Sequence, residues 1–393
     1  MPTWLGDAVM ATPFLRALRD IYPAVRITCL GKPLVLPVLS GLSLIDGTME
    51  YRHTPAGKID TAGTIADLRQ QHFDLAIILP NSLRSALLAW RAGIPRRLGY
   101  NRDGRKLLLT DSLNPVPRSE REIRLQLQRR NVQQLIRTSR WPGSGALWPK
   151  AEQFALWRVK LAGWNNFQPL PTIDYYLELS RYLGSGQTDR RMMLGITNDE
   201  REAAAAALAQ AGLTEKTPYM MLFPGAHFGA SKCWMPERFA AVAAAVVDSR
   251  KHQNVAVLIG GSIAEQPLVD AIVANMPKLA AARVIPLYKL HGGSGVLLGA
   301  VKELVRRARV VLCNDTGPRH FAAALGTPLV TLFGPTDPRW AEIFYNQERV
   351  VAVEVPCGPC QLKICPIDHR CMTGITPEMI LQAVDYFWPG DAA

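Results

Sequence analysis

The polar stretch NDTGPRH follows an apolar segment and carries the residues best suited to hold a ligand. Gly317 permits a tight turn after the predicted strand, and Pro318 suits the first position of a helix. Backbone amides at a helix start attract phosphate, and Asp315, Thr316 and His320 can hydrogen-bond at the same place. The stretch therefore predicts a phosphate or sugar site. The alternative is that Asp315 only caps the helix and His320 only packs against the core.

Glycine-containing stretches also follow other predicted strands. In PGAHFGASKCW, Gly225 lets the backbone approach a ligand, and Lys232 offers a positive charge to a phosphate. Glu265 comes after the glycine pair of NVAVLIGG, where a carboxylate can accept hydrogen bonds from ribose hydroxyls. LHGGSGVLLG is a fourth such stretch. Ligands of parallel sheets lie beyond the carboxyl ends of the strands, so we expect a site there. A solvated lysine and a surface glutamate are the plainer alternatives.

Asp7 is the carboxylate of interest in the first half of the chain. It lies in MPTWLGDAVMATPFLRALRD, where a Gly-Asp pair leads directly into an amphipathic pattern. A carboxylate at this turn can act as a general base toward an attacking hydroxyl. The alternative is an N-cap for a helix that begins at Ala8. An α/β protein normally places a buried strand before such a turn, and the residues ahead of Gly6 leave no room for one.

Four of the seven cysteines form the spacing C-x2-C-x4-C-x5-C. They are Cys357, Cys360, Cys365 and Cys371, and His369 lies between the last two. The spacing is typical of a structural metal site, with reduced thiols or oxidised pairs as the alternatives. An odd total without a secretion signal argues against a secreted disulfide scaffold. The cluster is far in sequence from the phosphate-like turns, so we expect no metal in the catalytic site.

Apolar segments alternate with helical patterns in both halves, which indicates parallel sheets covered by helices on both faces. Strands are predicted over 25–31, 73–80, 219–226, 254–261, 309–315 and 328–335, and helices over 61–72, 82–93, 199–212, 235–250, 299–308, 318–326 and 376–388. The stretch RYLGSGQTDRR is the best linker candidate. We therefore expect two α/β domains, over 1–180 and 181–375, with a cleft between them and a closing helix over 376–393.

The excess positive charge is confined to the first half of the chain. Residues 1–175 hold 24 Lys and Arg against 13 Asp and Glu, and the remainder is nearly balanced. A basic helix is predicted over 120–139. The imbalance suggests an anionic partner such as nucleic acid, a phospholipid surface or a phosphorylated substrate. An unevenly charged solvated surface is the alternative.

The motifs that the chain lacks weigh against several functions. There is no GxxxxGK[ST] of a P-loop NTPase, and no GxGxxG with an acidic residue about 20 positions later, as in dehydrogenases. No Asp-x-Asp pair is present to hold a divalent cation on a diphosphate. No apolar run reaches the length of a membrane span, and no secretion signal is recognisable, so the expected location is the cytoplasm.

Four stretches together resemble the bacterial ADP-heptose:lipopolysaccharide heptosyltransferases, the middle two the heptosyltransferase II branch in particular. They are PTWLGDAVMATPFLRALR, LPNSLRSALLAWRAGIPRRLGY, FPGAHFGASKCWMPERFAAVA and NDTGPRHFAAALGTPLVTLFGPTDP. The resemblance covers nearly the whole chain, and the cysteine cluster also recurs in the family. It implies a GT-B fold, which is two Rossmann-like domains with the active site between them. It also implies an apolar strand before the Gly-Asp turn, which residues 1–180 lack.

The resemblance further implies an inverting, metal-independent enzyme without a cofactor. The donor would be ADP-heptose, and the acceptor a phosphorylated heptosyl-Kdo-lipid A at the inner face of the inner membrane, with no role for nucleic acid. Asp7 falls on the proposed base, and Arg84, Arg96 and Arg97 are candidate acceptor contacts from their charge and position. The residues that fall on the donor site are Gly225, Lys232, Glu265, Asp315, Thr316, Gly317 and His320.

Two other functions fit parts of the pattern. The chain could be a GT-B glycosyltransferase that uses a different nucleotide sugar, in which case ADP would not be the preferred nucleotide. From a different class, it could be a non-catalytic protein that binds an anionic glycolipid or nucleic acid, as the basic half suggests. The intact NDTG and SK turns argue against the second alternative, because such a protein needs no donor site.

Overall fold

The computed structural model describes residues 1–117, 167–249 and 254–389, which form two compact units. Within these ranges, unit 1 ends at Arg190 and unit 2 begins at Arg191. The division falls later than the expected boundary at 180, because the proposed linker is tied to unit 1. The guanidinium of Arg16 lies 3.2 Å from the carboxylate of Asp189. The predicted basic helix over 120–139 lies outside the described residues.

Unit 2 is built on one parallel sheet of six strands in the order β11-β10-β9-β6-β7-β8. The strands are β6 (Tyr219–Phe223), β7 (Ala256–Ile259), β8 (Val284–Pro286), β9 (Val310–Asn314), β10 (Leu329–Phe333) and β11 (Glu348–Ala352). Every residue of β6, β7, β9 and β10 is buried, which explains their continuous apolar sequences. The expected parallel sheet is therefore confirmed in this unit.

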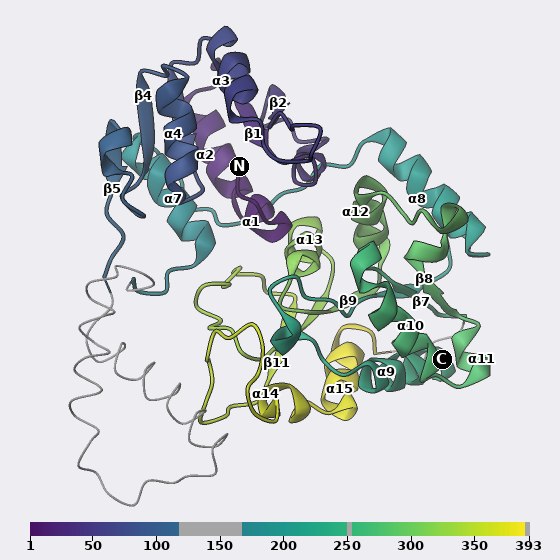
Figure 1. Ribbon diagram of the computed structural model, residues 1–393. Helices are drawn as coiled ribbons and strands as arrows, with labels where there is room; N and C mark the ends of the chain where they lie inside the picture. Colours follow the sequence, from purple (N-terminus) through teal and green to yellow (C-terminus); the bar gives the residue numbers. More distant parts are fainter. Residues whose placement is uncertain (118–166, 250–253, 390–393) are drawn as a thin grey trace, which may run out of the picture. The chain divides into compact units, whose positions relative to one another are not determined.

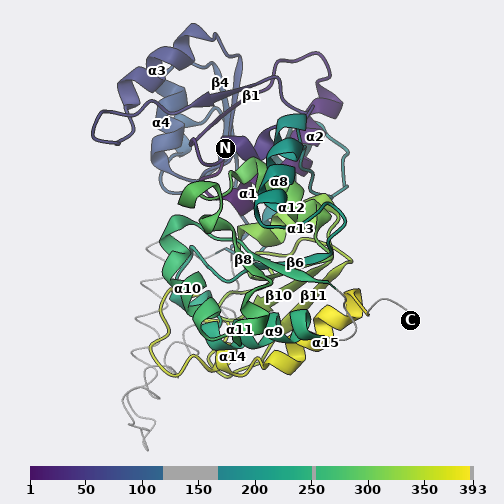
Figure 2. The same ribbon diagram turned by 90° about the vertical axis from the view of Figure 1, so that its right-hand side faces the viewer.

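Helices cover both faces of this sheet (Figures 1 and 2). On one face lie α8 (Asn198–Gln210), α12 (Leu298–Arg307) and α13 (Gly317–Leu325). On the other lie α9 (Pro236–Asp248), α10 (Gln266–Ala274), α11 (Lys278–Ala281), α14 (Arg370–Thr373) and α15 (Pro377–Phe387). Side chains from this second group pack with β6, β7, β9 and β10 in one buried apolar cluster. The closing helix α15 is thus part of the core of unit 2.

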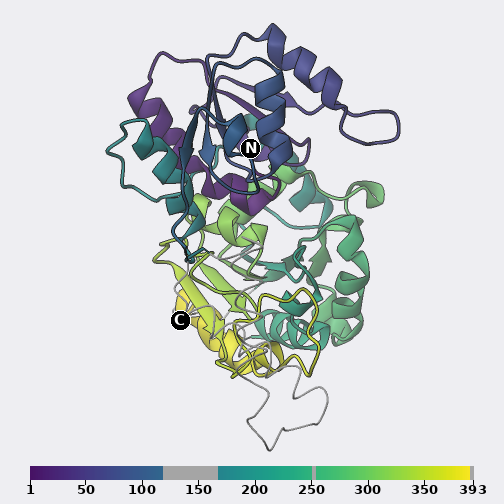
Figure 3. The same cartoon turned by 60° about the vertical axis from the view of Figure 1, so that its left-hand side comes forward.

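Unit 1 contains two separate groups of parallel strands, β1-β2 and β3-β4-β5. They are β1 (Thr28–Gly31), β2 (Gly47–Glu50), β3 (Leu75–Ile78), β4 (Arg96–Tyr100) and β5 (Asp111–Leu113). The helices are α1 (Leu5–Met10), α2 (Thr12–Ile21), α3 (Thr61–Gln70), α4 (Leu83–Arg91) and α7 (Thr172–Tyr182). In Figure 3 the strands of unit 1 lie between two pairs of helices. One pair is α2 (purple) and α7 (teal), and the other is α3 and α4 (blue).

An apolar cavity of about 680 Å³ separates β1 from β3 in unit 1. Within the described part of the chain, β1 pairs only with β2, and β3 pairs only with β4. The cavity is lined mostly by apolar side chains, among them Phe14, Leu15, Leu18, Leu30, Leu75, Ile77 and Leu88. Two strand edges therefore face each other across apolar space. The strand that the resemblance implies before the Gly-Asp turn stays a prediction, and this cavity is the place in unit 1 where a strand would fit.

The start of the chain differs from the expected single helix over 8–20. The structure has two helices, α1 and α2, which meet at Ala11. Pro13 lies in the first turn of α2, where its missing N–H costs no hydrogen bond. Asp7 is the third residue of α1 and Trp4 occupies the N-cap position, so the N-cap alternative for Asp7 is wrong.

Elsewhere the predicted helices match closely. Ser82 caps α4 by accepting a hydrogen bond from the amide of Ser85, as its position in the sequence predicts. Thr197 and Glu200 form a reciprocal capping box at the start of α8. None of the helices in the described ranges has both the length and the apolar character needed to cross a bilayer.

Candidate active site

The order of the strands in unit 2 brings two of the predicted stretches together. The chain first forms β6, then adds β7 and β8 on one side, and returns to add β9, β10 and β11 on the other. The two runs diverge between β6 and β9, which pair directly, with Phe223 opposite Cys313. Loops at such a reversal separate and leave a crevice beyond the carboxyl ends of the two strands. The loop with Lys232 follows β6, and Asp315 follows β9.

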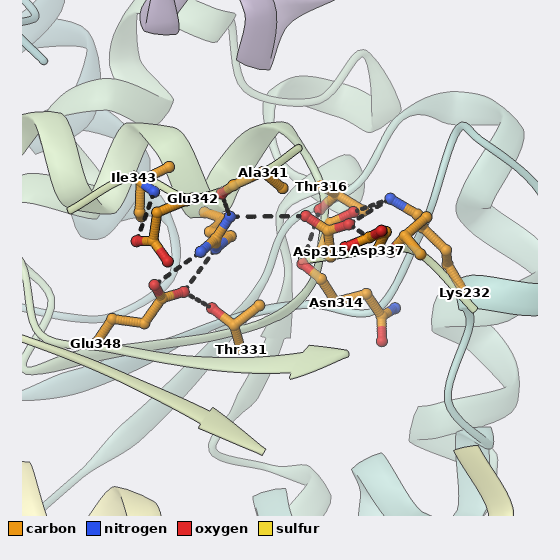
Figure 4. A network of polar contacts seen from close by, with 12 residues as sticks. Lys232, Asn314, Asp315, Thr316, Thr331, Asp337, Ala341, Glu342, Ile343 and Glu348 are labelled. Carbon is orange, nitrogen blue, oxygen red and sulfur yellow. Dashed lines mark hydrogen bonds and ion pairs between the residues drawn. The ribbon is translucent and has the colours of Figure 1, made fainter. Parts of the chain in front are cut away.

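Lys232 and Asp315 form a buried ion pair at this point (Figure 4). The Nζ atom of Lys232 lies 2.5 Å from Oδ2 of Asp315 and 2.9 Å from its carbonyl oxygen. The hydroxyl of Thr336 donates to the same Oδ2 at 2.8 Å. Burial disfavours the charge on Asp315, but the cations Lys232 and Arg319 outweigh it and lower the pKa of Asp315 below its ordinary value. Lys232 is therefore not a freely solvated lysine.

Asn314 ties the two strand ends together beneath this pair. Its side-chain amide donates to the carbonyl oxygen of Pro224 at 2.6 Å. Its other side-chain atom, Oδ1, is buried, and so is Nδ1 of His320. Neither atom has a hydrogen-bond partner among the described residues. Unpartnered buried polar atoms are rare in native proteins, so their occurrence at this turn supports a polar ligand-binding role.

Helix α13 begins directly after Asp315. Thr316 occupies its N-cap position, but its hydroxyl donates to the carbonyl of Asn314 and accepts no hydrogen bond from the helix. The alternative that Asp315 merely caps the helix is therefore wrong. Gly317 and Pro318 open the first turn, as predicted. Burial lowers the pKa of His320 to about 3, so its imidazole is neutral at physiological pH and acts only through hydrogen bonds.

Glu265 lies above Gly225, at the carboxyl ends of β7 and β6. A β-carbon at Gly225 would lie 1.6 Å from Oε1 of Glu265, so any larger residue there would displace this carboxylate. The other carboxylate oxygen accepts hydrogen bonds from the amide and hydroxyl of Ser262, at 2.7 and 2.8 Å. This capping box holds Glu265 half-buried beside the loop of Gly225. The structure thus groups Glu265 with the donor-site candidates.

A bidentate ion pair that the sequence analysis did not identify supports Asp315 from within the core. Nε and Nη2 of Arg319 donate to the two carboxylate oxygens of Glu348, at 2.6 and 2.8 Å. Nη1 of Arg319 lies 3.8 Å from Oδ1 of Asp315. The hydroxyl of Thr331 donates to Glu348 at 2.6 Å. Figure 4 shows this network running from β11 to Lys232.

Comparison with known proteins places the chain in a family. A sequence model described as glycosyltransferase family 9 (heptosyltransferase) matches residues 64–130 and 150–370. The chain belongs to this family. Lipooligosaccharide heptosyltransferase 2 of Haemophilus influenzae is 23% identical over 98% of this chain and 96% of its own length. Lipopolysaccharide heptosyltransferase 2 of Escherichia coli is 24% identical, again over 98% and 96%.

A solved structure of Escherichia coli ADP-heptose lipopolysaccharide heptosyltransferase II has the same fold. It superposes with a TM-score of 0.71 at 22% identity, covering 98% of this chain and 96% of the other. A family 9 glycosyltransferase of Veillonella parvula gives a TM-score of 0.69. The predicted GT-B fold with two Rossmann-like units is therefore confirmed, and so is the enzyme class, a glycosyltransferase.

In unit 1 of this glycosyltransferase, Asp7 lies in the first turn of α1 and is half-buried. Tyr176 lies on α7, which packs against α1. Burial, followed by the negative charge of Asp7, raises the pKa of Tyr176 well above its ordinary value. The side chain of Asp7 thus belongs to a partly desolvated environment. Such an environment suits a carboxylate that exchanges a proton with a bound hydroxyl.

The three arginines proposed for the acceptor are not brought together. Arg84 is exposed at the start of α4, after the carboxyl end of β3. Arg96 and Arg97 begin β4, at the opposite end of the same strands. Arg96 forms a fork with Asp111 at 3.1 and 3.2 Å, and Arg97 donates to the carbonyl of Leu108. Only Arg84 lies at the end of the sheet where parallel-sheet proteins bind ligands.

The four clustered cysteines of unit 2 surround one small cavity of about 10 Å³. All four are free thiols, and burial raises the pKa of Cys371 to about 11. His369, which lies between the last two cysteines in the sequence, forms a hydrogen bond through Nε2 with the carbonyl oxygen of Ser231. Within the described ranges, no three His, Cys, Asp or Glu side chains are arranged to hold a metal ion.

Proposed function

We propose that this glycosyltransferase transfers heptose from ADP-heptose to a phosphorylated heptosyl-Kdo-lipid A acceptor in lipopolysaccharide core synthesis. The observation that carries the proposal is the buried Lys232–Asp315 pair at the strand reversal of unit 2, beside the start of α13. The names of the relatives support the sugar and the product, since they are heptosyltransferases of lipopolysaccharide and lipooligosaccharide.

The donor would bind along the carboxyl ends of β6, β7 and β9. Lys232 and the amino end of α13 supply positive charge for the diphosphate. Glu265, held by Ser262, would accept hydrogen bonds from the ribose hydroxyls through its oxygen above Gly225. Asp315 would orient Lys232 and accept from donor hydroxyls. Each group is fixed before the ligand arrives, which reduces the entropy cost of binding.

The proposed reaction is a single displacement that inverts the anomeric centre. A hydroxyl oxygen of the acceptor heptose attacks the anomeric carbon, and the bond from that carbon to the diphosphate oxygen breaks. Asp7 takes the proton of the attacking hydroxyl, and ADP leaves with both electrons of the broken bond. Lys232 and the dipole of α13 stabilise the negative charge that develops on the diphosphate. The scheme requires no divalent cation.

The acceptor would be held by unit 1 at the inner face of the inner membrane. The excess positive charge of residues 1–175 suits a phosphorylated glycolipid in an anionic surface. Exposed Arg84, at the carboxyl end of β3, is the candidate contact that the geometry favours. This arrangement would make the enzyme a cytoplasmic protein that associates peripherally with the membrane.

Nucleotide binding measured by calorimetry tests the donor assignment. ADP is expected to bind more tightly than UDP, CDP or GDP. Lys232→Met is expected to weaken ADP binding by about 10- to 100-fold, since a hydrogen bond to a charged group is worth about 1.5–3 kcal/mol.

Lys302→Met is the matched control, because Lys302 also forms a buried ion pair in unit 2, with Glu200 at 2.9 Å. Its loss is expected to lower Tm and leave ADP affinity unchanged. Unchanged ADP affinity in Lys232→Met, or tighter binding of UDP, would reject the donor site as assigned.

A further inference from the structure

Asp315 is held between two cations that serve different purposes. Its Oδ2 accepts from Lys232 at 2.5 Å, and its Oδ1 faces Arg319 at 3.8 Å. Lys232 lies in the loop after β6, whereas Arg319 lies on α13, inside the unit. The side chains of Lys232 and Arg319 are 12% and 3% exposed, respectively. Lys232 is therefore the cation nearer to solvent, and Arg319 the one fixed in the core.

Arg319 has no freedom to contact a ligand itself. Its fork is closed by both oxygens of Glu348 on β11, and its remaining terminal nitrogen donates to the carbonyl of Ala341. The guanidinium also stacks 4.9 Å from the ring centre of Phe333. A lysine could not reproduce this planar, bidentate arrangement. Whatever Arg319 contributes to the donor site must pass through Asp315.

Binding of a diphosphate would change the ion pairing of Asp315. If Lys232 turns to the diphosphate, as the proposed function requires, Asp315 gives up its closest partner. A buried carboxylate left without a cation is strongly disfavoured, and that cost would weaken binding of the donor. Arg319 and the hydroxyl of Thr336 stay within reach and keep the carboxylate compensated.

We infer that Arg319, fixed by Glu348, is a positioning residue that holds Asp315 ionised and in place while Lys232 exchanges it for the donor diphosphate. The inference rests on the proposed donor site. It explains why the buried Arg319–Glu348 pair lies next to the Lys232–Asp315 pair, on the side of the core. The Arg319–Glu348 pair is neutral as a whole, so its role is local support of Asp315 rather than general attraction of an anion.

A double-mutant cycle measured with ADP by calorimetry tests this inference. The pair is replaced as a unit, by Arg319→Met with Glu348→Leu, so that no buried charge is orphaned and the net charge is unchanged. ADP affinity is expected to fall about tenfold, because Lys232 becomes the sole cation of Asp315. In the Asp315→Asn background, where no carboxylate needs support, the same replacement is expected to change ADP affinity by less than about twofold.

The same kind of fork on α12 provides the matched control. Arg306 donates to both oxygens of Glu303 at 2.7 and 2.6 Å, and Glu303 is buried. Arg306→Met with Glu303→Leu is expected to leave ADP affinity within twofold of wild type. Thr331→Val, which removes one hydrogen bond to Glu348, provides a milder variant of the same cycle if the pair replacement does not fold.

The possible results distinguish failure of this inference from failure of the proposed donor site. An equal loss of affinity in the wild-type and Asp315→Asn backgrounds overturns the positioning role, because the pair would then act independently of Asp315. No loss in either background overturns it as well. If Lys232→Met also binds ADP normally, the proposed donor site has failed, and the cycle identifies that result separately.

Discussion

The two units of this glycosyltransferase differ in whether the strands at the centre of the sheet pair with each other. In unit 2, β6 and β9 pair directly, so that the loops following them present Lys232 and Asp315 to each other at 2.5 Å. In unit 1, the corresponding central position lies between β1 and β3, and a cavity of about 680 Å³ separates these strands. A parallel sheet concentrates polar groups only where neighbouring strands are joined. Unit 2 meets this condition throughout its sheet.

The two units also differ in how their charges are used. The ion pairs at the centre of unit 2 are buried and linked, from Glu348 through Arg319 and Asp315 to Lys232. In unit 1, Arg96 and Asp111 form a largely solvated pair, although hydrogen bonds, first from Arg96, lower the pKa of Asp111 to about 2. Buried polar networks hold their side chains in one arrangement, whereas solvated ion pairs contribute little to stability. The buried network therefore suits the donor binding that we propose for unit 2, whereas Asp7 is the residue of unit 1 that we propose for the chemical step.

The largest expected effect tests whether unit 1 supplies the chemistry. Asp7→Asn is expected to lower kcat by about 10²-fold or more, the usual contribution of a general base. ADP affinity, which we assign to unit 2, is expected to stay unchanged. Steady-state kinetics and calorimetry measure the two quantities. Asp20→Asn, at an exposed carboxylate of the same unit, is the control. Near-normal turnover by Asp7→Asn would reject the base.

A stability experiment tests whether the cavity is what distinguishes unit 1. An apolar strand of about five residues joined ahead of Met1 would start against β1, since the amino group of Met1 donates to the carbonyl of Leu30. Filling the cavity and pairing both strand edges is expected to raise Tm by about 5 °C. A Gly/Ser extension of equal length is the control. Equal Tm values for both extensions would show that the cavity does not accept a strand.

The buried histidine of unit 2 predicts that stability depends on pH above the range in which the carboxylates titrate. Burial lowers the pKa of His320 to about 3, so between pH 6.5 and 3 the unfolded chain binds the proton and the folded chain does not. Stability is therefore expected to fall as pH decreases through this range, by about 2 kcal/mol from pH 6.5 to 5. His320→Gln is expected to flatten Tm against pH there, and His72→Gln, at an exposed position, to leave the slope unchanged. A wild-type slope in His320→Gln would contradict the burial argument.

The smallest expected effects separate the arginines of unit 1. Arg84→Ala is expected to raise KM for the acceptor severalfold without altering ADP affinity, because its side chain is exposed at the carboxyl end of β3. Arg96→Ala is expected to leave this KM unchanged and to cost less than about 1 kcal/mol of stability, as a solvated pair does. Acceptor kinetics on both variants decide the matter. A larger KM effect at Arg96 would reverse our placement of the acceptor.

Much of this protein follows from its sequence alone. Continuous apolar runs such as VVLCN predict buried parallel strands, and local signals such as Ser82 before α4 predict where helices begin. These features depend on neighbours in the chain, so the sequence is sufficient. The glycine and proline of NDTGPRH likewise predict the start of α13 and single out Asp315, and PGAHFGASKCW singles out Lys232.

Only the tertiary structure decides which of those candidates meet. Strand order places β9 beside β6 and so joins Lys232 to Asp315, residues 83 positions apart in the sequence. It also reveals Arg319 and Glu348, whose charges alone resemble those of any surface pair until burial and the fork become visible. The same packing separates Arg84 from Arg96 and Arg97, although they lie close in sequence. Local patterns determine elements, whereas pairing between distant strands determines which side chains share a site, because that pairing depends on the whole sheet.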